Sequence, residues 1–161
     1  MKEVGLKYED LTNLACTVGP GGFTSLRIGI TAVNTLAYAL GIPSAGIHLS
    51  DLWLARAQTQ DTRHKTQENP SQMFWLHSTR KTQLFVKDFD SDEIKLLTLD
   101  EVKNLKCSYV GELIEDHKQA LPNCTPVPND QVMTLEEVLP SFLADLNYDA
   151  DQLQPWYGRN A

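Results

Sequence analysis

One segment near the start of the chain constrains its fold more than any other. The run Leu14–Val18 is short, apolar and bounded by glycine and proline, which is typical of a buried strand. It is followed by the glycine-rich turn Gly19-Pro20-Gly21-Gly22 and by a stretch with helical periodicity, Thr24–Leu40. Gly41 is a suitable C-terminal cap for that helix. The segment therefore predicts a strand, a turn and a helix in succession, and the alternation of strands and helices further along predicts an α/β fold.

The expected helix is apolar on two sides. One side is a continuous seam with spacings of three and four residues: Leu26, Ile30, Val33, Ala37 and Leu40. The other side carries Ile28 and a set of mostly small residues: Gly29, Ala32, Leu36 and Ala39. One seam suffices to attach a surface helix to its own sheet, so we predict that the second set, Gly29, Ala32, Leu36 and Ala39, is a partner interface. The alternative is that part of this face covers the protein's own core.

The turn itself suggests two uses for its glycines. Glycines expose backbone N–H groups, and the start of the next helix adds partial positive charge, so an anion or nucleotide could contact the turn. The residues expected in that role are Gly19, Gly21, Gly22, Thr24 and Arg27. Alternatively, the glycines only allow close packing of strand and helix, and Arg27 forms a salt bridge. A Walker loop is excluded because the turn has no lysine.

We expect two small α/β subdomains. The boundaries predicted are 1–58 for the first subdomain, 59–71 for a polar loop or linker, 72–148 for the second subdomain and 149–161 for a C-terminal docking tail. Strands are expected at 42–47, 72–76, 83–89, 94–98 and 108–111, and helices at about 48–58, 99–105, 112–119 and 135–146.

The composition of the chain limits which kinds of partner and which cellular compartment are expected. The net charge is −7, and no basic stripe offsets it, so direct nucleic-acid binding is not expected. The three cysteines, Cys16, Cys107 and Cys124, are odd in number and far apart, which argues against a disulfide framework or a zinc cluster and favours a cytoplasmic protein. No apolar run is long enough to span a bilayer, so no membrane association is expected.

Catalytic and cofactor signals are not found in the sequence. The four histidines, His48, His64, His77 and His117, show no metal-ligand spacing, and no nucleophile–base pair can be recognised. We therefore expect no catalytic residue, no metal and no cofactor.

The whole segment from Gly19 to Gly29 resembles a known family signature. Its sequence, G-P-G-G-F-T-S-L-R-I-G, resembles the G-P-G-S-F-T-G-L-R-I-G string of the TsaB/YeaZ family and differs at two positions, Gly22 and Ser25. The resemblance extends to Leu6–Leu11, to Ala39–Pro43 and to the ending Trp156–Arg159, and is weak from Thr59 to Asp130.

This resemblance implies both a fold and a function. The fold would be the actin-like ATPase (ribonuclease H-like) fold with glycoprotease-like relatives. The function would be that of a non-catalytic partner or scaffold subunit in the biosynthesis of threonylcarbamoyladenosine (N6-threonylcarbamoyl adenosine) in tRNA. The implied partners are the homologous catalytic subunit and the small ATPase subunit of the threonylcarbamoyl transfer complex, with a homodimer as a further alternative.

The start of the chain departs from the family pattern. Family members open with an I-D-T-S-like strand, further strands and a helix before the signature, and this sequence has none of them before Leu6. We therefore expect an N-terminally truncated version of the fold in which the strand Leu14–Val18 keeps an unpaired edge. Two other functions stay open: a peptidase-like or nucleotide-binding enzyme of the glycoprotease fold, or a degenerate inactive fragment.

Overall fold

The computed structural model describes residues 5–57 and 72–158. Contacts divide the chain into two compact units, Met1–Leu49 with Pro140–Ala161, and Ser50–Leu139. Pro140–Ala161 thus belongs with the first unit. The boundaries expected from the sequence instead counted 140–148 with the second subdomain and 149–161 as a separate tail. The expected linker 59–71 lies outside the described residues.

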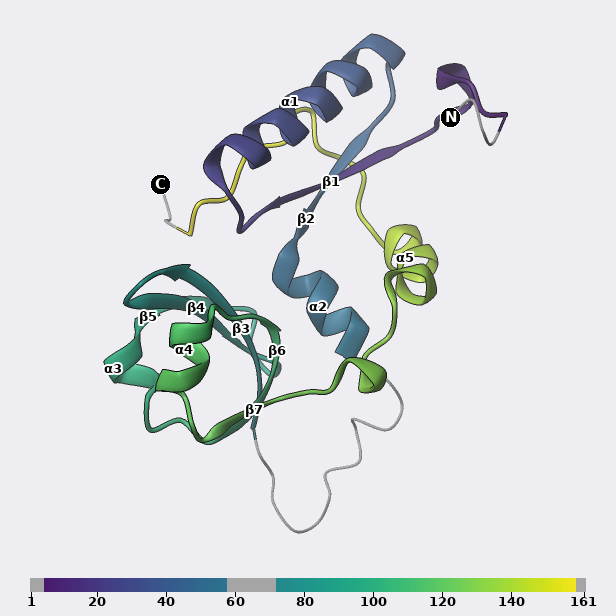
Figure 1. Cartoon of the computed structure of the whole chain (residues 1–161). Helices are drawn as coiled ribbons and strands as arrows, with labels where there is room; N and C mark the ends of the chain where they lie inside the picture. Colours follow the sequence, from purple (N-terminus) through teal and green to yellow (C-terminus); the bar gives the residue numbers. More distant parts are fainter. Residues whose placement is uncertain (1–4, 58–71, 159–161) are drawn as a thin grey trace. The chain divides into compact units, whose positions relative to one another are not determined.

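The first unit is built on a strand–helix–strand segment. Strand β1 (Leu14–Gly19) leads through the glycine-rich turn into helix α1 (Phe23–Leu40), which is followed by strand β2 (Ser44–His48). The two strands are parallel neighbours, and α1 lies beside them (Figure 1). Among the described residues β1 has β2 as its only strand partner, which agrees with the expected unpaired edge.

The end of α1 forms as the sequence predicts. Gly41 adopts a left-handed conformation with φ of 65°, which glycine reaches without a steric penalty. Its backbone N–H donates to the carbonyl of Tyr38, and the next N–H, of Ile42, donates to Ala37. These bonds satisfy carbonyls that the helix end would otherwise leave open.

The core of the first unit lies between α1 and the C-terminal segment. Leu26, Ile30 and Leu153 are buried together, and Cys16, Val18, Val33 and Ala150 pack around them. The segment after α5 (Leu135–Ala144) also bonds to β2, because the N–H of Ala150 donates to the carbonyl of Ser44. The same segment runs along α1 in Figure 1, coloured yellow.

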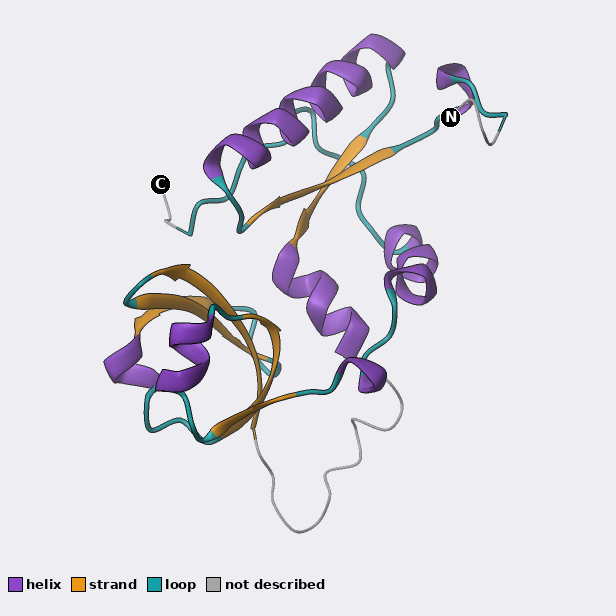
Figure 2. Ribbon diagram, viewed as in Figure 1, coloured by secondary structure: helices purple, strands orange, loops and turns teal. Residues whose placement is uncertain are grey.

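The second unit contains a five-stranded sheet in the order β5-β4-β3-β6-β7. Strands β3 (Gln72–Arg80), β4 (Gln83–Asp88) and β5 (Ile94–Thr98) form an antiparallel meander, and β6 (Cys107–Glu112) and β7 (Cys124–Pro126) continue it in parallel. Two short helices, α3 (Leu99–Val102) and α4 (Glu115–Ala120), lie on one side of this sheet (Figure 2).

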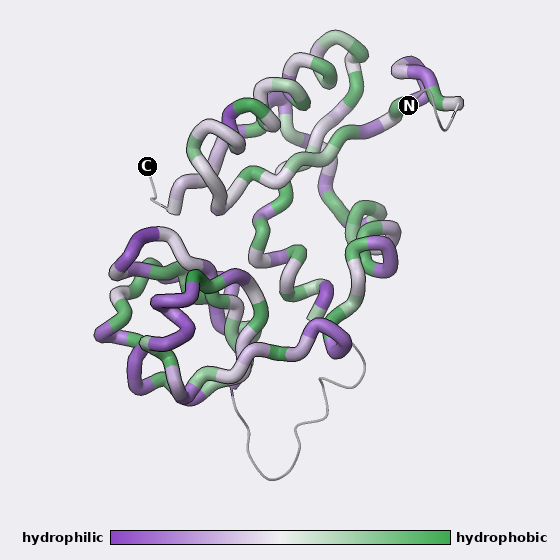
Figure 3. Tube along the Cα trace, in the orientation of Figure 1, coloured by the Kyte–Doolittle hydropathy of each residue, from purple (hydrophilic) through white to green (hydrophobic). Residues whose placement is uncertain are grey.

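The second unit has its own hydrophobic core beneath those helices. The core includes Phe74 and Leu76 from β3, Leu84 and Val86 from β4, and Tyr109 from β6. These residues alternate along their strands, as one face of a pleated sheet requires. The segments that join the strands of this unit include hydrophilic stretches, coloured purple in Figure 3.

Helix α2 (Leu49–Ala57) contributes an ion pair to the second unit. The ammonium of Lys87 on β4, which is almost fully buried, lies 2.8 Å from the carboxylate of Asp51. A buried ammonium without a partner would be costly, so Asp51 offsets the desolvation of Lys87.

Several expected elements were wrong in extent or were missed. The strand expected at 72–76 continues to Arg80, and the expected helix 99–105 ends at Val102. Strand β7 and a short 3-10 turn at Asn129–Gln131 were not predicted, because three residues are too few to show periodicity. Within the described part of the chain, no helix is long and apolar enough to cross a membrane.

Candidate functional site

The glycine-rich turn is shaped by a close backbone approach at Gly19. Its φ is 152°, and a Cβ added there would lie 2.3 Å from the carbonyl oxygen of Trp156. The N–H of Trp156 donates to the carbonyl of Val18 at 2.8 Å, which holds the C-terminal tail against the end of β1. At Gly19, therefore, the need for glycine is explained by packing.

The other two glycines lie at the start of α1. Gly22 is the N-cap, with extended φ and ψ of −61° and 131°, and its carbonyl accepts the N–H of Leu26. A Cβ at Gly21 would meet the side chain of Leu26 at 3.2 Å, whereas at Gly22 the nearest atom is the Ser25 hydroxyl at 3.6 Å. Gly22 and Thr24 are exposed. Contact of an anion with Gly19, Gly21, Gly22, Thr24 and Arg27 stays a prediction.

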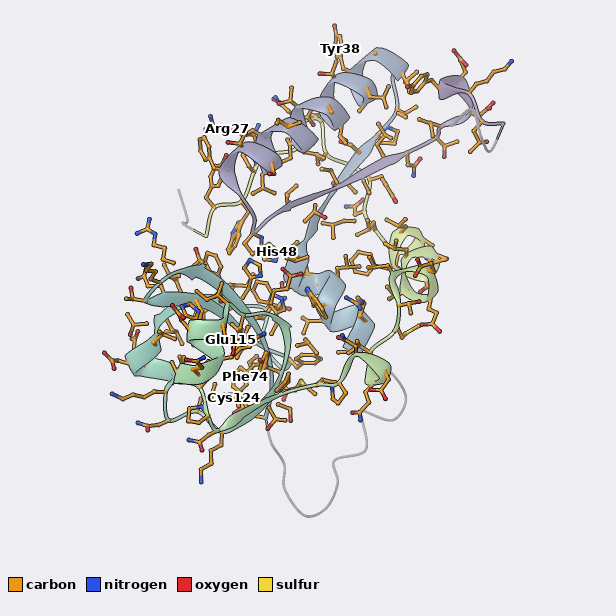
Figure 4. The ribbon with its side chains drawn as sticks, viewed as in Figure 1. Arg27, Tyr38, His48, Phe74, Glu115 and Cys124 are labelled. Atoms are coloured by element: carbon orange, nitrogen blue, oxygen red, sulfur yellow. The ribbon has the colours of Figure 1, made fainter. Side chains whose placement is uncertain are left out.

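Arg27 contacts aromatic side chains of α1 and the tail. Its guanidinium stacks on the ring of Phe23, 3.8 Å from the ring centre, and its Nε donates to the Tyr157 hydroxyl at 3.0 Å. The rings of Phe23 and Tyr157 also stack, with centres 5.4 Å apart. No carboxylate of the described residues pairs with Arg27, so the salt-bridge alternative is not supported, and Arg27 (labelled in Figure 4) joins a cation–aromatic cluster between α1 and the tail.

The two sides of α1 differ in burial as their sequence pattern suggests. Leu26 and Ile30 of the seam are buried, and Val33 packs against the same core. On the second side Ile28 is 66% exposed, and Ala32 and Ala39 are also exposed. The outer part of this side is therefore an apolar surface in contact with solvent.

Gly29 and Leu36 occupy the border between the two sides. Both are half-buried, and a Cβ at Gly29 would meet the Cys16 sulfur at 3.6 Å, an ordinary contact distance. Of the four residues predicted as an interface, Ala32 and Ala39 are exposed, while Gly29 and Leu36 are half-buried. The role of all four as an interface stays a prediction.

A hydrogen-bonded clamp joins α1 to the C-terminal tail. The Asn34 amide donates to the Leu153 carbonyl at 3.0 Å, and its oxygen accepts the Leu153 N–H at 2.9 Å. The ring of Trp156 packs edge-on against His48, with centres 4.4 Å apart. The predicted tail thus packs against α1 and the ends of β1 and β2.

The structure also brings together two residues that the sequence did not pair, Ser78 and His117. Ser78 Oγ lies 2.9 Å from His117 Nδ1 and accepts the N–H of Ile114, while His117 Nε2 lies 3.1 Å from the Lys81 carbonyl. The carbonyl can only accept, so the Nε2 of His117 carries a proton and donates to it. His117 is fully buried, and each of these polar atoms has a hydrogen-bond partner. These bonds link α4 to the β3–β4 hairpin.

A second unexpected pair consists of two of the three cysteines. Cys107 and Cys124 lie opposite each other on β6 and β7, although the sequence analysis regarded the three thiols as far apart. Cys16 lies apart from them in the core of the first unit, where burial raises the pKa of its thiol. Across the described residues, no group of three histidines, cysteines or carboxylates could hold a metal ion.

The family of the chain is shown by comparison with known proteins. A family model described as "TsaD: tRNA N6-adenosine threonylcarbamoyltransferase" matches residues 1–138. The chain belongs to this family. A tRNA N6-adenosine threonylcarbamoyltransferase from Lacticaseibacillus casei is 51% identical over 43 residues, which cover 27% of this chain and 13% of that protein. One from Geotalea uraniireducens is 34% identical over 62 residues, covering 35% of this chain and 18% of the relative.

Two solved structures share the fold over almost the whole chain. One is YeaZ from Pseudomonas aeruginosa, with a TM-score of 0.62, 17% identity, and coverage of 97% of this chain and 78% of that one. The other, described as similar to peptidase YEAZ from Pseudomonas aeruginosa, has a TM-score of 0.63, 17% identity, and coverage of 98% and 78%. The predicted TsaB/YeaZ resemblance and the α/β, actin-like fold are therefore confirmed. The aligned regions span under a fifth of the curated transferases.

Proposed function

We propose that this chain is a non-catalytic partner subunit in threonylcarbamoyladenosine biosynthesis, and that it binds the homologous catalytic subunit through the outer face of α1. Its family links it to the modification of tRNA by threonylcarbamoyl transfer. The observation that carries the proposed role is the exposed apolar surface formed by Ile28, Ala32 and Ala39. Single exposed apolar residues are ordinary, but several apolar residues exposed on one helix face are typical of an interface.

The shape of this surface favours a partner helix. Ala32 and Ala39 are small, so a second helix can approach α1 closely, while Ile28 projects at one end as an apolar anchor. In addition, α1 is held by its buried seam and by the Asn34 clamp to the tail. A surface held in one conformation loses little entropy on binding.

The competing hypothesis is that the chain catalyses the transfer itself, since its curated relatives bear the name of the transferase. The two hypotheses predict different results with purified proteins. As a partner subunit, the chain alone does not modify tRNA and acts only with the catalytic subunit present. Modification of tRNA by the chain alone would overturn the proposed role.

Co-purification with the cognate catalytic subunit tests the interface directly. Ala32→Arg places a charge where the partner would bury it, and an uncompensated buried charge costs several kcal/mol. We expect affinity to fall about 100-fold or more, since about 1.4 kcal/mol corresponds to a factor of ten. Because Ala32 is exposed in the free chain, the unfolding midpoint of the variant should stay near that of the parent.

Tyr38→Arg provides the matched control, because Tyr38 is 91% exposed on α1 and lies about 100° or more around the helix from Ala32 and Ala39. This variant should bind the catalytic subunit with almost unchanged affinity. Equal loss of binding in both variants would show a general effect of added charge. Unchanged binding by Ala32→Arg would place the interface elsewhere. Size-exclusion chromatography of the chain alone distinguishes a homodimer through the same face.

A further inference from the structure

Two buried thiols meet where the edge strand of the second unit begins. Cys107 opens β6 and Cys124 opens β7, and the two residues are paired in the parallel ladder. Their sulfur atoms lie 2.6 Å apart, although 17 positions separate them in sequence. Cys107 donates its S–H to the Cys124 sulfur, and Cys124 donates to the carbonyl of Leu105 at 3.3 Å.

The backbone already has the spacing that a disulfide needs. Neighbouring strands lie about 4.8 Å apart, which falls within the Cα separation of about 4.4–6.8 Å that a disulfide can bridge. The two side chains lie on the same face of the sheet, since both belong to the core of the second unit. The thiols can therefore be joined by small side-chain rotations, without moving β6 relative to β7.

Access to the pair is controlled by β7. Cys107 is 3% exposed and Cys124 is 9% exposed, so neither reacts readily in the closed sheet. Burial, followed by its hydrogen bond to Cys124, raises the pKa of the Cys107 thiol far above the ordinary value. Strand β7 has three residues, lies at the sheet edge and contains Pro126, which has no N–H to donate. Local opening of this edge exposes Cys124 first.

We propose that Cys107 and Cys124 close into a reversible intrachain disulfide when a peroxide oxidises the folded protein. The Cys124 thiolate attacks one oxygen of hydrogen peroxide, the O–O bond breaks, and the products are a sulfenic acid and, after protonation, water. Cys107 then attacks the Cys124 sulfur, forming the S–S bond and releasing the second oxygen as water. Two thiols lose two electrons and two protons in total, and the peroxide is reduced to two waters.

Thiol counting on the full chain tests this proposal. The native protein is treated with hydrogen peroxide, the peroxide is removed, and free thiols are alkylated with iodoacetamide in denaturant. Intact mass should show one alkyl group after oxidation, on Cys16, and three in the untreated protein. Digestion with trypsin without reduction should yield the peptide Cys107–Lys118 linked to Gln119–Arg159, and dithiothreitol should release the two.

Substitutions distinguish the pair from other thiol chemistry. Cys16→Ser should leave the linked peptides unchanged, whereas Cys124→Ser and Cys124→Ala should each abolish them while circular dichroism shows a folded chain. Three alkyl groups after peroxide treatment of the folded protein would overturn the proposal. Sulfinic acid without linked peptides would also overturn the proposal, and so would an intermolecular disulfide through Cys16. None of these outcomes depends on the role proposed for α1.

Discussion

The clamp between Asn34 and Leu153 provides a quantitative test of how the C-terminal tail is held. Replacing Asn34 with alanine removes both hydrogen bonds, at 3.0 and 2.9 Å, and leaves the N–H and carbonyl of Leu153 without these partners in a partly buried position. Each bond contributes about 1 kcal/mol net, and an unsatisfied partly buried group adds to the loss. Alanine is a better helix former than asparagine by roughly 0.6 kcal/mol, which offsets part of the cost.

We therefore expect Asn34→Ala to lower the free energy of unfolding by about 2 kcal/mol. Urea unfolding followed by circular dichroism and tryptophan fluorescence measures this change. Thr35→Ala is the matched control, because Thr35 is the exposed neighbour on the same helix and the same kind of propensity gain occurs there without loss of a clamp. The control should be neutral or slightly stabilising.

A loss below about 0.5 kcal/mol in Asn34→Ala, after correction by the control, would refute the reasoning. It would mean that the apolar contacts of Leu153 with Leu26 and Ile30 hold the tail without the clamp. A change equal to that of Thr35→Ala would show that the measured change reflects helix propensity alone.

Two further predictions concern the turn and the pH response. Gly19→Ala should destabilise the protein by about 2 kcal/mol or more in urea unfolding, because its Cβ would lie 2.3 Å from the Trp156 carbonyl oxygen. Gly22→Ala should cost less than about 1 kcal/mol, because the nearest atom would be at an ordinary contact distance of 3.6 Å and the φ of −61° suits alanine. Equal costs would contradict the close approach at Gly19. Hydrogen bonds from the backbone N–H and the hydroxyl of Thr134 lower the pKa of Glu137 below its ordinary 4.5. These bonds therefore contribute fully to stability above pH 4.5, and their contribution is lost as the pH falls through the lowered pKa. Glu137→Gln should flatten the decrease of the unfolding midpoint below pH 4.5, and an unchanged pH profile would exclude this capping carboxylate as a source of acid sensitivity.

Local patterns in the sequence determined the first strand, the first helix and its end. A short apolar run predicts β1 because glycine and proline bound it, and α1 follows from a seam of apolar residues at helical spacing. Gly41 ends α1 in the sequence analysis and in the structure, since the left-handed conformation that a helix end requires favours glycine. These features depend on residues a few positions apart, so the sequence alone suffices to predict them.

Only the tertiary structure decided which distant residues meet. Cys107 and Cys124 become neighbours because two parallel strands align in one register, and nothing in their spacing indicates that register. Ser78 and His117 meet because a hairpin and a short helix close over the same core. Arg27 shows the same limit, since its partner Tyr157 comes from the opposite end of the chain.

For the candidate interface on α1, too, one part could be predicted from the sequence and another depended on the tertiary structure. Periodicity indicated two apolar sides and separated Ala32 from the buried seam, but it could not say whether the second side is covered. Burial depends on every segment that packs nearby, including the tail around Leu153, which returns to the first unit after the whole second unit has been traversed. The pattern of α1 is thus encoded locally, while the exposure of its outer face is a property of the folded chain.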